Sequence, residues 1–314
     1  MSDESLNRLA SISEFDLSCY GQADTGSDRA DLDAVEIIFG SWGAPVLTRQ
    51  LLDRMPSLRV LVYAAGSVKH LLTEEAIKRE IRVSSAAQVN ARPVAEYTLA
   101  MIILGLKRVF EWERSYRRDG WTQRSPGPVA TTGMYGRTVG IVGASHIGKR
   151  VIELLRPFDV RVLLSDPYNT VDDPAIRHVS LEELLEGSDV VSLHCPLTPE
   201  TERMIGAPEL RRMRTGATLI NTARGGLVDE EALVQELRRG RISAILDVTD
   251  PLEPLPHGHP LLRLDNVTVT PHLAGSFGSE TRRLGEFAVS EVQRYLRGER
   301  MHGEVDIRSL ARQA

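Results

Sequence analysis

The sequence predicts an α/β protein of two domains built on parallel sheets, and three observations carry that prediction. The chain has 314 residues, which is more than a single hydrophobic core usually serves. From about residue 31, short apolar runs alternate with stretches of helical periodicity, the order that produces parallel strands covered by helices. A glycine turn at 138–148 joins an apolar run to a helix and opens a second alternating block.

Composition narrows the classes of function. The hydrophobic share is 42% and the net charge is −5, so globular packing is expected and a nucleic-acid partner is not. No apolar run approaches the roughly 18 residues of a membrane span, and the N-terminus lacks the pattern of a secretion signal. The two cysteines, Cys19 and Cys195, stand far apart. We therefore expect no disulfide framework, no membrane association and a cytoplasmic location.

The first alternating block predicts strands at 35–40, 59–65 and 81–86 and helices at 47–55 and 73–80. Residues 94–118 then predict one long helix. Its first half is apolar nearly all round, so it should be buried, in its own domain or against another subunit. Residues 120–136 are rich in Gly, Pro and Thr and are typical of a connection.

The second block predicts strands at 137–143, 160–166, 189–195, 217–223, 242–248 and 267–272. Helices are expected at 147–158, 180–187 and 229–240. Ser180 and Glu183 have the spacing of a capping box, and Gly240 suits a helix end. A final helix at roughly 279–297 can return to the first block. The two chain ends would then form one domain and the middle of the chain the other.

The glycine turn has the features of a nucleotide cradle. Gly143, Ser145 and Gly148 occupy the positions of a GxGxxG pattern, with serine in the middle place. The N-terminus of the following helix offers N–H groups and partial positive charge to phosphate. Asp166 ends the next strand, about 20 residues further on, where a carboxylate accepts from ribose hydroxyls. It would repel a 2′-phosphate, so NAD is favoured over NADP; a purely structural turn is the alternative.

Three polar residues follow later apolar runs: Arg224, Glu253 and His272. The guanidinium fork suits a carboxylate with an adjacent carbonyl, and the two glycines after Arg224 should leave room for such a ligand. Histidine can give and take a proton near neutral pH. A carboxylate beside it would fix its tautomer and favour the charged ring. Asp250 competes with Glu253 for that role.

Together these motifs resemble the D-isomer-specific 2-hydroxyacid dehydrogenase family. The resemblance covers about residues 35–290 and is densest at 188–206, 221–233 and 246–276. It implies a Rossmann NAD-binding domain (94–280) inserted into a flavodoxin-like substrate domain (1–93 and 281–314). The first strand expected of that substrate domain is not evident in residues 1–17. The resemblance also implies a homodimer whose interface includes the long helix.

The same resemblance assigns roles by position. Arg224 matches the substrate-binding arginine, His272 the acid/base that also contacts substrate, and Glu253 its carboxylate partner. Backbone N–H groups of Gly66 and Ser67 should hold the substrate carboxylate. The positions matching cofactor contacts are Gly143, Ser145, His146, Ile147, Gly148, Asp166, Pro196, Thr222, Ala223 and Asp247. No metal site is predicted.

The implied activity is NAD-linked interconversion of a D-2-hydroxy acid and a 2-oxo acid. Hydroxypyruvate, glyoxylate, 3-phosphoglycerate and branched 2-oxo acids all stay open as substrates. Formate oxidation is disfavoured, because similar enzymes carry glutamine where Glu253 stands. The alternatives are phosphite oxidation on a related scaffold, an NADH-sensing protein similar to a corepressor, and a catalytically impaired relative.

Overall fold

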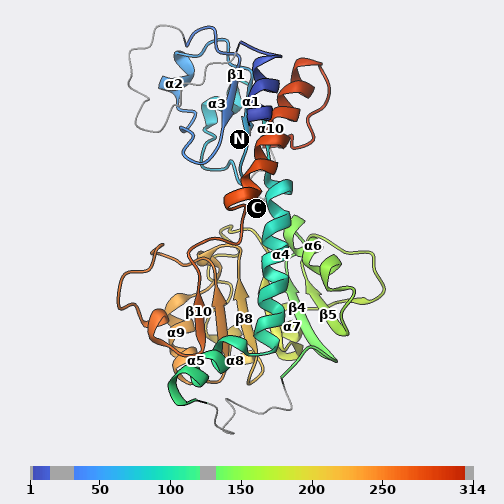
Figure 1. Cartoon of the computed structure of the whole chain (residues 1–314), viewed down its shortest axis with the longest axis vertical. Helices are drawn as coiled ribbons and strands as arrows, with labels where there is room; N and C mark the ends of the chain where they lie inside the picture. The colour runs from blue at the N-terminus through green and yellow to red at the C-terminus, as the bar shows by residue number, and fades with distance from the viewer. Residues whose placement is uncertain (1–2, 15–31, 121–131, 308–314) are drawn as a thin grey trace. The chain divides into compact units, whose positions relative to one another are not determined.

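The computed structural model describes residues 3–14, 32–120 and 132–307, and the chain divides into two compact units (Figure 1). Unit 1 comprises Met1–Ala91 with Ser276–Gln313, and unit 2 comprises Arg92–Gly275. The middle of the chain is thus inserted into a unit made by both ends. The chain passes between the units at residues 91–92 and 275–276. The boundaries expected from the sequence were 93–94 and 280–281.

In its described residues, unit 1 is built on three parallel strands in the order β1–β2–β3. They are β1 (Ile37–Gly40), β2 (Val60–Tyr63) and β3 (Arg82–Ser85). Side chains of β2 alternate between two cores, as the period of a strand requires. Val60 and Val62 share one core with α1 (Asp3–Ala10) and α10 (Thr281–Leu296). Leu61 and Tyr63 share the other with α2 (Arg49–Asp53) and with the α3 segment (Glu74–Lys78).

A buried carboxylate joins the C-terminal segment to unit 1. Glu291 of α10 has no exposed surface, and a charge in that position needs partners. It accepts hydrogen bonds from Ser84 Oγ at 2.6 Å, from the His302 N–H at 3.0 Å and from the Gly303 N–H at 2.8 Å. These bonds tie α10 and the chain after it to β3, so the last part of the sequence completes the first domain.

Unit 2, as far as it is described, is built on seven parallel strands in the order β10–β9–β8–β7–β4–β5–β6. The strands are β4 (Arg137–Val142), β5 (Val160–Ser165), β6 (Ile176–His178), β7 (Val190–Leu193), β8 (Thr218–Asn221), β9 (Ser243–Leu246) and β10 (Val267–Val269). This is the Rossmann order with one strand added, so the predicted α/β class is confirmed. The order reverses between β4 and β7, and ligands bind where such a reversal occurs.

Helices cover both faces of this sheet (Figure 1). On one face α4 (Ala87–Leu106) and α6 (His146–Leu155) pack in a single core against β4, β5, β8 and β9. The other face carries α7 (Leu181–Gly187), α8 (Ala207–Arg212) and α9 (Glu230–Arg238). Ser180 caps α7 by accepting from the Glu183 N–H at 3.1 Å, and Asp229 caps α9 by accepting from the Ala232 N–H at 3.0 Å.

The prediction of one continuous helix at 94–118 is wrong. The segment forms α4 and a second helix, α5 (Val109–Asp119). Arg108, between them, has φ 54°, a left-handed conformation that interrupts a helix. A run of helix-forming residues does not reveal this break, because tertiary contacts of α5 impose it.

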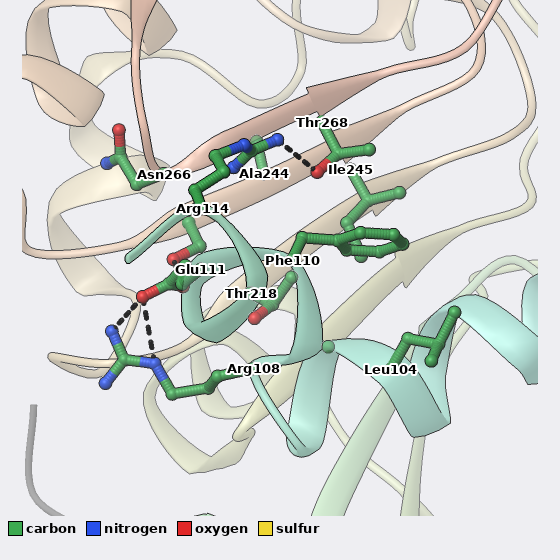
Figure 2. Close-up of a pocket in the computed structure, with 12 residues that line it drawn as sticks. Leu104, Arg108, Phe110, Glu111, Arg114, Thr218, Ala244, Ile245, Asn266 and Thr268 are labelled. Carbon is green, nitrogen blue, oxygen red and sulfur yellow. Dashed lines mark hydrogen bonds and ion pairs between the residues drawn. The ribbon is translucent and has the colours of Figure 1, made fainter. Parts of the chain in front are cut away.

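Figure 2 shows this region, where residues from the amino ends of β8, β9 and β10 line a small pocket beside α5. Arg108 Nε donates to Glu111 at 3.1 Å, and Ser243 Oγ donates to the same carboxylate at 2.6 Å. Arg114 Nη2 donates to Thr268 Oγ1 at 2.9 Å. These hydrogen bonds hold α5 against β9 and β10. The pocket lies at the edge opposite to the strand ends that carry the candidate site.

Among the α-helices and strands of the described residues, α1, β6 and α8 were not predicted. The described residues do not include 15–17, which belong to the segment in which no first strand was evident. They also do not include Cys19 or most of the predicted connection at 120–136. Among the helices that the structure describes, none combines the length and hydropathy of a membrane span.

Candidate active site

The candidate residues of unit 2 lie at the carboxyl edge of its sheet. Because the strands are parallel, their carboxyl ends share one edge. The glycine turn follows β4, Asp166 follows β5 and Arg224 follows β8. His272 follows β10 at the same edge. This is where open α/β sheets place their ligands.

Two glycines of the turn are required by its own packing. Gly143 has φ +97°, and a Cβ there would lie 2.6 Å from the Cys195 backbone nitrogen. A Cβ on Gly148 would lie 2.0 Å from the Gly143 carbonyl oxygen. Ser145 differs, because its φ of −64° is open to any residue, and its side chain caps α6 by accepting from the Gly148 N–H at 3.4 Å. Serine in the middle position therefore fits the turn and stabilises the helix start.

Asp166 is joined to the glycine turn. One carboxylate oxygen accepts from the Ala144 N–H at 2.6 Å, and the other accepts from the Tyr168 and Asn169 N–H groups, each at 2.8 Å. Partial burial acts to raise the pKa of Asp166, but these hydrogen bonds outweigh it and lower the pKa. The residue therefore carries a negative charge beside the turn at neutral pH.

The loop carrying Arg224 is fixed by the last residue of β8. Asn221 Nδ2 donates to the Arg224 carbonyl at 2.8 Å, and Asn221 Oδ1 accepts from the Ala223 N–H at 3.1 Å. Arg224 Nη1 donates to the Ala223 carbonyl at 2.6 Å. Desolvation lowers the pKa of Arg224 and the Glu253 carboxylate raises it. Arginine stays cationic under such influences, and this residue keeps solvent-exposed surface.

The glycines after Arg224 do not leave room for a ligand as predicted, because protein occupies that space. A Cβ on Gly225 would lie 2.2 Å from the Thr249 carbonyl carbon. A Cβ on Gly226 would lie 3.1 Å from the end of the Leu197 side chain. Gly225 thus lets the loop after β9, which carries Glu253, approach the loop that carries Arg224.

His272 and Glu253 form a direct pair. His272 Nδ1 lies 2.5 Å from Glu253 Oε1, and Glu253 Oε2 accepts from the Thr249 N–H at 3.2 Å. An ionised carboxylate can only accept, so Nδ1 carries the proton that it donates and Nε2 is the nitrogen available to a ligand. Glu253, rather than the rival Asp250, meets the ring. The Glu253 charge also favours the charged form of Arg224.

The backbone at His272 is unusual. Its φ is 53°, a left-handed conformation that a residue with a side chain adopts only when its surroundings impose it. The His272 N–H donates to the Asp247 carbonyl at 3.0 Å. The Asp247 carboxylate, 1% exposed, accepts from the Leu273 and Ala274 N–H groups at 2.9 Å each. Asp247 therefore shapes the turn that presents His272, a role that the sequence did not reveal.

The other predicted cofactor positions lie along the same edge. His146 and Ile147 begin α6, where helical N–H groups have no partner within the helix. Thr222 and Ala223 are 6% and 7% exposed after β8, and Pro196 follows the end of β7.

The predicted substrate-carboxylate positions belong to unit 1. Gly66 and Ser67 follow β2, and Ser85 Oγ donates to the Gly66 carbonyl at 2.5 Å. The unit 2 candidates thus lie along one edge of the unit 2 sheet, and Gly66 and Ser67 follow a strand of unit 1.

His194, at the end of β7, had no role in the sequence analysis. It is 2% exposed, and Nε2 lies 2.9 Å from Ser192 Oγ. Burial lowers the pKa of His194 to about 3, so the ring is neutral under the glycine turn. Its Nδ1 has no hydrogen-bond partner within the described residues.

Comparisons with known proteins show the family of the chain. Residues 99–274, more than half of the chain, match the family model described as D-isomer specific 2-hydroxyacid dehydrogenase, NAD binding domain. A glyoxylate reductase of Thermofilum pendens is 38% identical over 257 residues, which cover 80% of this chain and 75% of that protein. A D-3-phosphoglycerate dehydrogenase of Methanocaldococcus jannaschii is 31% identical over 258 residues, covering 81% of this chain and 48% of that longer protein.

A solved structure extends the likeness to the whole fold. The D-lactate dehydrogenase of Aquifex aeolicus, complexed with NAD and lactic acid, aligns with a TM-score of 0.72 and 29% identity. The alignment covers 94% of this chain and 92% of that one.

Proposed function

The chain belongs to the D-isomer specific 2-hydroxyacid dehydrogenase family, and on that premise we propose that Arg224, Glu253 and His272 form its active site. The enzyme is an NAD-dependent oxidoreductase acting on 2-hydroxy acids. The observation that carries the residue assignment is the 2.5 Å contact between His272 Nδ1 and Glu253 Oε1. It orients the His272 ring, and the same carboxylate favours the charged form of Arg224.

The turn after β4 fits a dinucleotide. Gly143 and Gly148 allow no Cβ, and α6 begins at that point with N–H groups that have no acceptor within the helix. We assign the pyrophosphate to Ser145, His146 and Ile147, and the ribose hydroxyls to Asp166. Its charge disfavours a 2′-phosphate, which supports NAD over NADP. Thr222, Ala223 and Pro196 are the proposed neighbours of the nicotinamide, and Asp247 acts there through the turn that it shapes.

Arg224 is proposed to bind the substrate. Its fork of donors can hold the carboxylate and the adjacent carbonyl oxygen of a 2-oxo acid together. Bound NADH supplies the hydride for reduction. As negative charge grows on the carbonyl oxygen, the fixed guanidinium stabilises it without having to reorganise. Gly66 and Ser67 are proposed to contribute backbone N–H groups to the carboxylate from unit 1.

His272 is proposed to move the proton. In reduction the imidazolium donates from Nε2 to the carbonyl oxygen, and Glu253 stabilises the charged ring through Nδ1. In oxidation the neutral ring accepts the hydroxyl proton at Nε2. Because Nδ1 stays bonded to Glu253, the ring keeps one orientation in both directions.

Small 2-oxo acids are the proposed substrates, with glyoxylate as the first to assay. The most similar relative reported above is a glyoxylate reductase, and a D-3-phosphoglycerate dehydrogenase is also similar. Rates with glyoxylate, hydroxypyruvate and pyruvate, each measured with NADH and with NADPH, test both the substrate class and the cofactor preference. Tight NADH binding without turnover of any 2-oxo acid would favour a nucleotide sensor instead.

The Glu253→Gln variant tests the proposed pair. Removing the carboxylate should lower kcat for 2-oxo acid reduction by roughly 10²-fold, at the lower end of general acid–base contributions. The control is Asp250→Asn, in the same loop, which removes an exposed carboxylate that does not meet the ring. It should keep kcat close to that of the parent enzyme. A large loss in Asp250→Asn together with a normal rate in Glu253→Gln would transfer the role to Asp250.

A homodimer is also proposed, with α4 and α5 in its interface. Apolar side chains of α4 keep partial exposure at Met101, Ile103 and Leu104, and Tyr116 of α5 is 61% exposed. Covering this apolar surface would stabilise an association. Sedimentation equilibrium tests it, and a monomer at micromolar concentration would contradict it. A cytoplasmic location stays a prediction from the sequence.

A further inference from the structure

Helix α4 makes two hydrogen bonds to the edge of the sheet that carries the candidate catalytic residues. Tyr97 and Thr98 are consecutive on the helix. Each bonds a threonine that stands two positions before a candidate catalytic residue: Thr270 before His272, and Thr222 before Arg224. One turn of one helix thus contacts two separate strand-end loops.

The bond made by Tyr97 has a definite direction. Thr270 Oγ1 lies 2.6 Å from Asp247 Oδ1, and that carboxylate can only accept when ionised, so the threonine proton goes to Asp247. The Tyr97 hydroxyl oxygen lies 2.8 Å from Thr270 Oγ1, so Tyr97 must be the donor in this hydrogen bond and Thr270 the acceptor. The chain of bonds runs from α4 through Thr270 to Asp247, whose carboxylate shapes the left-handed turn at His272.

The bond made by Thr98 is buried. Thr98 has no exposed surface and Thr222 is 6% exposed, with 2.9 Å between the two hydroxyl oxygens. A buried hydroxyl that loses its partner costs free energy, so this bond holds its two residues in place. Thr222 leads directly into Ala223 and Arg224, whose loop is held on its other side by Asn221.

We propose that Tyr97 and Thr98 are positioning residues: Tyr97 sets the place of His272 and Thr98 that of Arg224. The inference rests on the proposed function, in which His272 moves the proton and Arg224 binds the carboxylate. The two bonds should then affect different kinetic constants. Misplacing the acid/base slows the chemical step, whereas misplacing the arginine weakens substrate binding.

The test compares two variants that each remove one hydroxyl, in the full-length enzyme with NADH and glyoxylate. Tyr97→Phe should lower kcat by about tenfold and leave the KM for glyoxylate near its parent value. Thr98→Val should raise the KM for glyoxylate by about tenfold, with a smaller effect on kcat. Thr270→Val should repeat the Tyr97→Phe effect, and Thr270→Ser, which keeps the hydroxyl, should restore kcat. Tyr135→Phe, at an exposed tyrosine before β4, is the control and should change neither constant.

The outcomes separate this inference from the proposed function. If His272→Ala abolishes turnover while Tyr97→Phe and Thr98→Val keep parent kcat and KM, the positioning role is overturned and the active site stands. The positioning role would also be overturned if Tyr97→Phe and Thr98→Val both lowered the melting temperature and changed kcat and KM in the same way. The two bonds would then have a structural role only. If His272→Ala turns over normally, the proposed function itself fails.

Discussion

At the scale of single residues, close backbone approach decides how the site is assembled. The place of Arg224 and His272 at one edge of the sheet could be predicted, because each follows an apolar run and parallel strands share a carboxyl edge. The roles proposed for them and for Glu253 came from the family resemblance. The partners that place them could not be predicted. Thr98 meets Thr222, and Tyr97 meets Thr270, across separations of more than a hundred residues, which local patterns do not encode. The prediction for the two glycines after Arg224 was wrong for a similar reason.

Gly225→Ala tests the close approach of the two loops. Its Cβ would lie 2.2 Å from the Thr249 carbonyl carbon, which is backbone and cannot yield without moving the Glu253 loop. We expect kcat/KM to fall by roughly 10²-fold, the scale of a displacement of about 1 Å in an active site. Gly226→Ala is the matched control, because its Cβ would meet the flexible end of Leu197 at 3.1 Å. Equal activity of the two variants in steady-state assays would show that the loop contact is unimportant.

At the scale of elements, most strands and helices could be predicted from periodicity and capping residues, and the exceptions have physical causes. The break at Arg108 depends on polar contacts of α5 with β9 and β10, near their amino ends (Figure 2). β6 has one buried residue followed by two exposed ones, so no apolar run marks it in the sequence. Ser145, in the middle position of the glycine turn, has a role that its place in the sequence explains, because it caps α6.

His194, directly after β7, makes a pH-dependent contribution to the free energy of unfolding. Burial lowers the pKa of His194 from 6.5 to about 3. Between these values the unfolded chain binds a proton at this residue and the folded protein does not, so acidification favours unfolding. In His194→Gln the contribution is absent. The free energy of unfolding should then fall less steeply than in the parent as pH drops below 6.5, by up to about 1.4 kcal/mol per pH unit.

Urea unfolding of both proteins from pH 8 to pH 5 checks this prediction. Any loss of packing in His194→Gln lowers its stability equally at every pH, so the comparison rests on the slopes. Above pH 7.5 the two curves should run parallel. Parallel curves down to pH 5 would show that the imidazole is already protonated in the folded protein.

At the scale of the whole molecule, the discontinuous layout was predicted from the final helix and is seen in the two units. Glu291 and its partners show why the C-terminal segment belongs with β3. The family match at 99–274 falls within unit 2, the unit with the glycine turn and the candidate catalytic residues. The chain enters that unit within α4, the helix that also bonds the loops before Arg224 and His272.

The most direct test of the central proposal is the rate of NADH oxidation by His272→Ala with glyoxylate, combined with an NADH titration by fluorescence. We predict a loss of roughly 10²- to 10⁴-fold in kcat, the usual range for a general acid, with NADH binding retained. The matched His257→Ala variant, which removes an exposed loop imidazole, should keep the parent rate. Near-normal turnover by His272→Ala, with NADH bound, would contradict the assignment of proton transfer to this residue.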